Sequence, residues 1–90
     1  MVFEWDKAKA LNNFKKHKIF FNEAASIFGD PLAVTFNDPD HSVGEHRYLT
    51  FGLSRINHLL VVAHTAEKGR IRIISARLMS KQERKIYEQI

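Results

Sequence analysis

The stretch HLLVVAHTAEKGRIRIISAR, residues 58–77, sets the expected fold. Its first part, HLLVVAHT (58–65), is apolar on both faces, which is typical of a central β-strand. Its last part, RIRIISAR (70–77), alternates polar and apolar residues, as a strand with one exposed face does. Glu67-Lys68-Gly69 between them predicts a hairpin turn in which Gly69 supplies a positive φ. The stretch therefore predicts two antiparallel neighbours in a sheet.

The rest of the chain predicts three more strands and three helices. The strands are expected at residues 2–5 (VFEW), 32–36 (LAVTF) and 46–54 (HRYLTFGLS). Asp6 can cap a helix from about residue 7 to 17, and Asn22 a shorter one that Gly29 ends in a left-handed conformation. Ser80-Lys81-Gln82-Glu83 has the form of a capping box, so a last helix is expected over about residues 81–88.

These elements predict a small α+β fold that forms a single domain over residues 1–90. Their order along the chain is β-α-α-β-β-β-β-α. Because consecutive strands are joined by short connections, we expect the sheet to be an antiparallel meander with the helices on one of its faces.

Composition excludes several kinds of protein. The 90 residues include no cysteine, which excludes disulfides and cysteine-based zinc sites. The longest apolar run, residues 59–63, is too short to cross a bilayer. The first residues, MVFEWDKAKA, lack the long apolar segment of a signal peptide. We therefore expect a soluble cytoplasmic protein with no membrane association.

Charge is distributed unevenly along the chain, whose net charge is +4. Residues 22–46 carry acids but no Lys or Arg, and arginines dominate the last third. Between residues 7 and 18 there are five lysines and no acid: Lys7, Lys9, Lys15, Lys16 and Lys18. This separation is compatible with two interpretations, a basic surface that binds nucleic acid or an ordinary solvated surface.

The arginines of residues 70–77 are the first candidates for contact with phosphate. Arg70 and Arg72 share one face of an extended strand, about 7 Å apart, and a guanidinium suits phosphate oxygens. Arg77 follows with the opposite parity. The alternative is that exposed strand arginines deter edge pairing or match acids across the strand.

His64 and Glu67 are the first candidates for proton transfer. A histidine in an apolar strand is more often packed and hydrogen-bonded than catalytic, but His titrates close to neutrality. Together with the arginines, these residues supply a base, an acid and cations. Those are the parts that a metal-free ribonuclease needs to activate a 2′-hydroxyl and stabilise a charged phosphorane.

The acidic stretch DPDHSVGEHRY, residues 38–48, contains possible metal ligands in Asp38, Asp40, His41 and Glu45. Their spacing matches neither a calcium loop nor a zinc helix. Asp-Pro-Asp followed by a Gly also favours a polar turn before a strand. We therefore expect no metal ion and no cofactor. Glu45 and Arg47 have the same parity, so they can pair with each other or with a neighbouring strand.

Several motifs resemble the BrnT family of type II toxins, in the right order from Phe3 to about Tyr87. They are FEWD (3–6), the segment around Lys16-His17, DPL (30–32), DPDHSVGEHR (38–47) and RIISAR (72–77). The resemblance implies a fold similar to RelE-type toxins. It also implies an endoribonuclease that blocks translation and growth. One departure is Lys18, where the family usually has Gly; Lys costs about 1 kcal/mol in a left-handed cap, so helix 7–17 is expected to end differently.

The resemblance also implies partners. A BrnA-like antitoxin with a ribbon-helix-helix part neutralises such toxins, and the complex represses its own operon, so operator DNA is contacted only through the antitoxin. Two toxins per antitoxin dimer would follow the symmetry of that dimer.

The candidate residues fall into two groups. The candidate catalytic residues are His64, Glu67, Arg72, Arg77 and Glu45. The candidate RNA-binding residues are Arg70, Arg47, Lys7, Lys15 and Lys16. Two alternatives remain open: a non-catalytic nucleic-acid-binding or corepressor module, and a structural partner of a small acidic protein.

Overall fold

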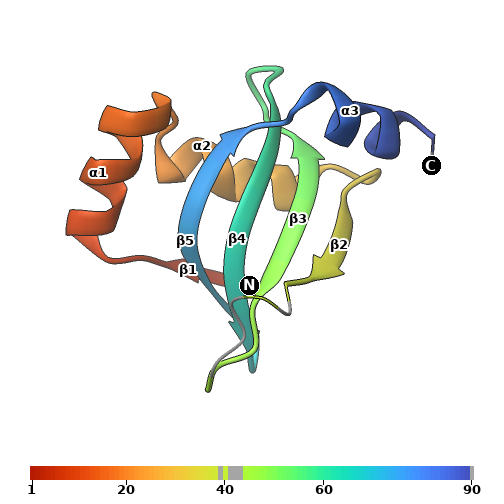
Figure 1. Cartoon of the computed structure of the whole chain (residues 1–90). Helices are drawn as coiled ribbons and strands as arrows, with labels where there is room; N and C mark the ends of the chain where they lie inside the picture. The colour runs from red at the N-terminus through yellow and green to blue at the C-terminus, as the bar shows by residue number, and fades with distance from the viewer. Residues whose placement is uncertain (39, 41–43, 90) are drawn as a thin grey trace.

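The computed structural model describes residues 1–38, 40 and 44–89. Its sheet has five strands in the spatial order β1-β5-β4-β3-β2 (Figure 1). The strands are β1 (Val2–Glu4), β2 (Val34–Asn37), β3 (Tyr48–Leu53), β4 (Leu59–Glu67) and β5 (Arg70–Leu78). The helices are α1 (Lys7–His17), α2 (Phe21–Ser26), the short 3₁₀ turn η1 (Ile27–Gly29) and α3 (Lys81–Glu88). The α+β class and the order of elements are as predicted, and none of the described helices is long and apolar enough to cross a membrane.

The sheet is mixed rather than wholly antiparallel. Strands β2 to β5 form the predicted antiparallel meander. Strand β1 adds to the free edge of β5 in parallel, with Phe3 opposite Ile71. Because β1 ends at Glu4, the remaining edge of β5 needs another partner. Asn13 of α1 fills that place: its amide donates to the carbonyl of Ala76 at 2.9 Å and accepts from the Ala76 N–H at 3.0 Å.

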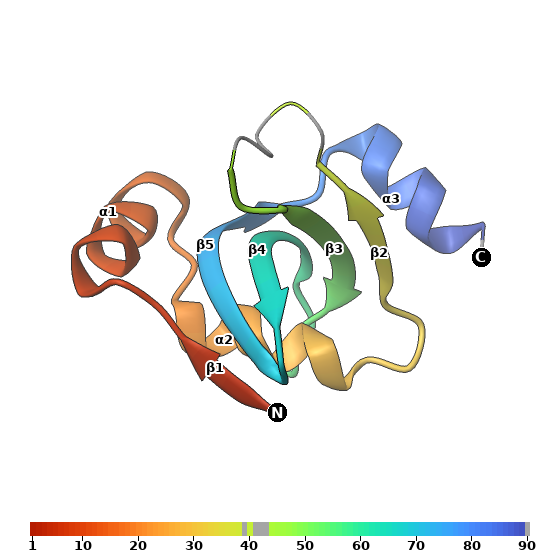
Figure 2. The ribbon, with the colours of Figure 1, turned by 90° about the horizontal axis from the view of Figure 1, so that it is seen from below.

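The helices cover both faces of the sheet, which corrects the expectation of helices on one face. Residues of α2 and the segment before it pack on one face, where the buried set comprises Ile19, Phe21, Ala24, Ile27, Leu60, Val62, Ile71, Ile73 and Ala76. On the other face, Tyr87 of α3 and Met79 pack on Phe51 and Val61. Figure 2 shows α2 and α3 on opposite sides of the curved sheet. The reason is that β4 is apolar on both faces, and both must be removed from water.

Local chain reversals follow the sequence in some places and depart from it in others. The β4–β5 turn has Lys68 and Gly69 at φ 49° and 79°, as a tight hairpin requires. Lys18 takes the left-handed conformation (φ 61°) despite its side chain, and its N–H donates to the Phe14 carbonyl at 2.8 Å. The α1 helix therefore ends as a glycine would end it, and the expectation of a different ending was wrong.

The predicted caps of α2 were also wrong. The helix begins at Phe21, so Phe20 and not Asn22 is its N-cap, without a side-chain hydrogen bond. Gly29 lies in η1 and has no positive φ. The 3₁₀ turn tightens the end of the helix, so a left-handed glycine is not needed there.

Candidate functional site

A β-bulge in β5 determines which side chains reach the open face of the sheet, meaning the part of the α3 side that α3 does not cover. His64 lies opposite Ile73, but Ala63 lies opposite Ser75, so Ile74 is an extra residue in β5. An extra residue reverses the parity of everything that follows it. The predicted opposite parity of Arg77 was therefore wrong: Arg77, opposite Val61, points to the same face as Arg72.

Four of the candidate residues line one hollow at the hairpin end of this face. The hairpin hollow has a volume of about 360 Å³ and is lined by Glu4, Glu45, Thr65, Glu67, Lys68, Arg70 and Arg72. Arg72 lies 3.5 Å from the Glu45 carboxylate and 3.8 Å from that of Glu4. All three side chains are partly exposed, so these ion pairs are weak and can open for an anionic ligand.

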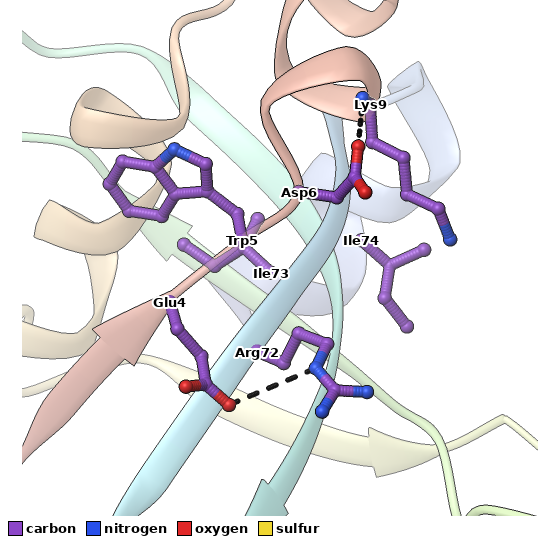
Figure 3. Close-up of a pocket in the computed structure, with 7 residues that line it drawn as sticks. All are labelled: Glu4, Trp5, Asp6, Lys9, Arg72, Ile73 and Ile74. Atoms are coloured by element: carbon purple, nitrogen blue, oxygen red, sulfur yellow. Dashed lines mark hydrogen bonds and ion pairs between the residues drawn. The ribbon is translucent and has the colours of Figure 1, made fainter.

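A second hollow adjoins the first and shares Arg72 with it. The bulge hollow, drawn in Figure 3, has a volume of about 420 Å³ and is lined by Glu4, Trp5, Asp6, Lys9, Arg72, Ile73 and Ile74. Glu4 and Arg72 lie at one end of it, and Asp6 and Lys9 at the other. The Asp6 carboxylate accepts from the backbone N–H of Lys9 at 3.0 Å, which is the predicted N-cap of α1.

A third hollow continues the second along α1. The helix hollow, about 230 Å³, is lined by Lys9, Asn12, Asn13, Lys16, His17, Ile74 and Ser75. Lys9 and Ile74 belong to both the bulge hollow and the helix hollow. The three adjoining hollows therefore form one surface depression along β5, which we call the β5 groove. Each of the three hollows is lined by at least one Lys or Arg.

His17 is the histidine of this groove, and the sequence interpretation did not select it. Burial, together with the positive charges of Lys16 and Arg77, lowers the pKa of His17 below its ordinary value. A neutral imidazole among cations can accept a proton at neutral pH. Lys9 was also not selected. Both residues could have been found from their helical spacing, which places them on the same side of α1 as Asn13 and Lys16. The sequence does not show, however, that this side of α1 faces β5.

A comparison of the sequence with protein families decides the identity of the chain. The family model described as "Ribonuclease toxin, BrnT, of type II toxin-antitoxin system" matches residues 5–83. The chain belongs to the BrnT family. The fold agrees: the 1.1 Å crystal structure of the Brucella abortus ribonuclease toxin BrnT superposes with a TM-score of 0.67 at 19% identity. The match covers 90% of this chain and 100% of that one. No curated protein matches the sequence.

Within this BrnT-family toxin, the lysines predicted to bind RNA divide between two sides of α1. Lys16 lines the helix hollow. Lys7 and Lys15 lie on the other side of the helix, with Leu11, as spacings of four residues require. The structure thus brings one of the three predicted lysines to the groove.

His64 lies in the core of this toxin rather than in the groove. It is 3% exposed, and its Nε2 lies 2.7 Å from the Thr50 hydroxyl. Its ring packs between Phe28 and Tyr48 on the α2 side of the sheet. Burial lowers its pKa, so the ring is neutral there. Of the two interpretations left open for His64, the packed one fits this position, because no phosphate on the open face can reach the ring.

Arg77 points to the α3 side of the sheet, where α3 already supplies it with a partner. Its guanidinium binds both carboxylate oxygens of Glu83, at 2.6 and 2.9 Å. Glu83 also completes the capping box of α3, where its carboxylate accepts from the Ser80 N–H at 2.8 Å. This position supports a structural role for Arg77, which ties the start of α3 to β5.

The stretch before β3 is described only in part. Glu45 pairs with Arg72, a residue of another strand, β5. Arg47 accepts a bond from the Asp38 N–H at its carbonyl, 2.9 Å away, and does not line the β5 groove as described. His41 lies outside the described residues, and so does the predicted turn at residues 39 and 41–43. Among the side chains that are described, no three His, Asp or Glu residues cluster as metal ligands would.

Proposed function

We propose that this BrnT-family toxin is a metal-independent endoribonuclease that cleaves an extended RNA strand lying along the β5 groove. The observation that carries the proposal is the position of Arg72. Its side chain lines both the hairpin hollow and the bulge hollow, so it is the cation that a phosphate would meet between them. Arg70 at one end of the groove, and Lys9 and Lys16 toward the other, would hold the flanking phosphates.

The proposed chemistry is transfer of the RNA phosphodiester to its own 2′-hydroxyl. His17 accepts the 2′-hydroxyl proton, and the oxygen attacks phosphorus. Arg72 stabilises the negative charge that gathers on the phosphoryl oxygens. The bond to the 5′-oxygen breaks, and the leaving oxygen takes a proton from a lysine ammonium of the groove or from water. The products are a 2′,3′-cyclic phosphate and a 5′-hydroxyl end.

Glu45 and Glu67 have a supporting role in this proposal. Both carboxylates line the hairpin hollow, and Glu45 lies 3.5 Å from Arg72. In the free toxin the carboxylate would hold the guanidinium toward the groove. When RNA binds, a phosphate replaces it, and the displaced carboxylate can act as a second proton acceptor.

The test is cleavage of a defined RNA by the purified toxin in the presence of EDTA. We expect undiminished cleavage that leaves 2′,3′-cyclic phosphate ends, identified by their resistance to direct ligation. Complete dependence on added Mg²⁺ would overturn the mechanism. RNA binding without any cleavage would instead favour the non-catalytic RNA-binding module.

We also infer that the toxin acts in the cytoplasm, where it blocks translation and growth until an antitoxin neutralises it. The family description supports a type II protein antitoxin. We propose a BrnA-like ribbon-helix-helix protein, with two toxins per antitoxin dimer and repression of the shared operon by the complex. Expression of the chain alone should arrest bacterial growth, and co-expression of the adjacent reading frame should relieve the arrest. Growth arrest that the neighbour leaves unchanged would remove this part of the proposal.

A further inference from the structure

An apolar groove lies on the side of α1 that faces away from the β5 groove. It consists of two adjoining hollows that share Phe20 and Asn22. One, about 230 Å³, is lined by Trp5, Ala10, Leu11, Phe14, Phe20, Phe21 and Asn22. The other, about 320 Å³, is lined by Phe20, Asn22, Glu23, Arg55 and Ile56. Leu11, Phe20 and Ile56 are 57%, 59% and 57% exposed. Large apolar side chains gathered in this way mark an interaction surface.

The apolar side chains are held in place by their neighbours. The Phe20 ring stacks on that of Phe14, with 4.1 Å between the ring centroids. The β3–β4 turn that carries Ile56 is fixed to α2, because the Arg55 N–H bonds to the Ser26 hydroxyl at 3.0 Å. The groove is therefore formed before any partner arrives, which lowers the entropic cost of binding.

The charged residues around this groove are basic. The Lys18 ammonium lies 5.6 Å from the centre of the Phe14 ring. Lys7 and Lys15 flank Leu11 on α1, and Arg55 lines the second hollow. Glu23 is the one acid among the described lining residues. It is 8% exposed, and its carboxylate is occupied by Ser54 and His58, each at 2.6 Å. The surface therefore favours a partner that is apolar at its centre and acidic at its margins.

We propose that this apolar groove binds an acidic amphipathic helix of the toxin's protein antitoxin. Two of its walls are helices, whose backbone groups are bonded internally, so a partner cannot add as a strand. Apolar side chains of the partner, spaced three and four residues apart, would enter the two hollows on either side of Phe20. The proposal rests on the antitoxin partnership proposed above. It assigns the two sides of α1 to two ligands, RNA on the Lys9 side and the antitoxin on the Leu11 side.

The experiment compares three charge-introducing variants in complex with the product of the adjacent reading frame. Leu11→Glu and Ile56→Glu place a carboxylate in the apolar groove. Ile86→Glu is the matched control, because Ile86 is also an exposed apolar residue, 44% accessible, but lies on α3. Affinity is measured by calorimetry, and circular dichroism checks that each variant is folded. The rate of RNA cleavage by the free variants is measured separately, so that a failure of the ribonuclease proposal is visible on its own.

We expect Leu11→Glu and Ile56→Glu each to weaken antitoxin binding by about tenfold or more. Ile86→Glu should bind like the wild type, and all three should cleave RNA at the wild-type rate. Wild-type affinity in both groove variants would overturn the proposal, as would equal weakening by Ile86→Glu. A toxin dimer in light scattering that Leu11→Glu dissociates would show that a second copy of the chain occupies the groove.

Discussion

Arg72 is the side chain on which the proposed ribonuclease site depends. It lines two of the three hollows of the β5 groove, and its only close partners among the described residues are the exposed carboxylates of Glu4 and Glu45. Exposed ion pairs of this length contribute little to stability. A substitution at this position should therefore affect function far more than folding.

We predict that Arg72→Ala lowers the rate of RNA cleavage by about two to three orders of magnitude, because the transition state loses the guanidinium that stabilises its negative charge. The free energy of unfolding, measured in urea, should change by less than about 1 kcal/mol. Arg84→Ala is the control, since Arg84 is an exposed arginine of α3 outside the groove. Cleavage by Arg72→Ala at the rate of the control would remove Arg72 from the site.

His17 should give the reaction its dependence on pH. Its pKa is lowered by burial and by the charges of Lys16 and Arg77, so the imidazole is already neutral near pH 7. A general base works in its deprotonated form, so the cleavage rate should rise with pH along an acidic limb that lies below the ordinary histidine range and should be flat at neutral pH.

His17→Gln should abolish this acidic limb together with most of the activity. Lys16→Gln should move the limb to higher pH, because it removes one of the charges that lower the His17 pKa. Initial rates on a defined RNA between about pH 5 and 8 provide the measurement. An acidic limb that persists in His17→Gln would assign the base to another residue.

At the scale of elements, the bulge in β5 is what allows α3 to be bound to the sheet. The extra residue Ile74 turns Arg77 to the face over which α3 lies, and Glu83 then joins α3 to β5. At the other end of α3, the Tyr87 hydroxyl donates to Asp30 at 2.6 Å. Burial and this bond raise the pKa of Tyr87 to about 12. Both ends of α3 are thereby held on the sheet, and α3 leaves the β5 groove uncovered.

We predict that Glu83→Gln destabilises the protein by about 1–2 kcal/mol at pH 7, because it removes the charge but keeps a side chain that fits a capping box. The guanidinium of Arg77 lowers the pKa of Glu83 from 4.5 to about 2. A lowered pKa stabilises the fold above the unfolded value, so the difference between wild type and variant should shrink as pH falls from about 5 toward 2.

Urea unfolding at a series of pH values measures this difference. Glu88 is an exposed acid on the same helix, so Glu88→Gln is the control. Its free energy of unfolding should differ little from that of the wild type, and the difference should not shrink between pH 5 and pH 2 as that of Glu83→Gln does. A Glu83→Gln difference that stays constant from pH 7 to pH 3 would contradict the ion-pair explanation.

At the scale of the whole molecule, α1 separates two surfaces. Its Lys9 and Lys16 side joins the β5 groove, and its Leu11 side joins the apolar groove. The lysines that the sequence shows as one basic block therefore serve different surfaces. Salt dependence can distinguish them, because each phosphate contact adds to the slope of affinity against salt.

We predict that Lys9→Gln weakens RNA binding and reduces the slope of log K against log salt by about 0.7, the value for one contact to a single strand. Lys15→Gln, on the other side of the same helix, should leave both quantities unchanged. Fluorescence anisotropy with a cleavage-resistant 2′-deoxy oligonucleotide measures them. Equal effects of the two substitutions would argue for a diffuse basic surface instead of a groove.

Much of the architecture could be predicted from the sequence. The hairpin turn at Lys68-Gly69, the Asp6 N-cap of α1, the capping box of α3 and the order of elements depend on residues within a few positions of one another. Local pattern is sufficient for such features. The family motifs were recognised for the same reason, since RIISAR and DPDHSVGEHR are contiguous in the chain.

Only the tertiary structure decided which side chains meet. The sequence by itself determined that an apolar strand and an arginine-rich strand are neighbours. It could not show that Ile74 is an extra residue, because a bulge is a property of the pairing with β4 and not of β5 alone. The positions of two histidines were also out of reach, because their neighbours are distant in sequence. His64 lies in the core beside Thr50, and His17 lies in the groove near Ser75 and Arg77. Only the packing of the elements brings each histidine to these neighbours.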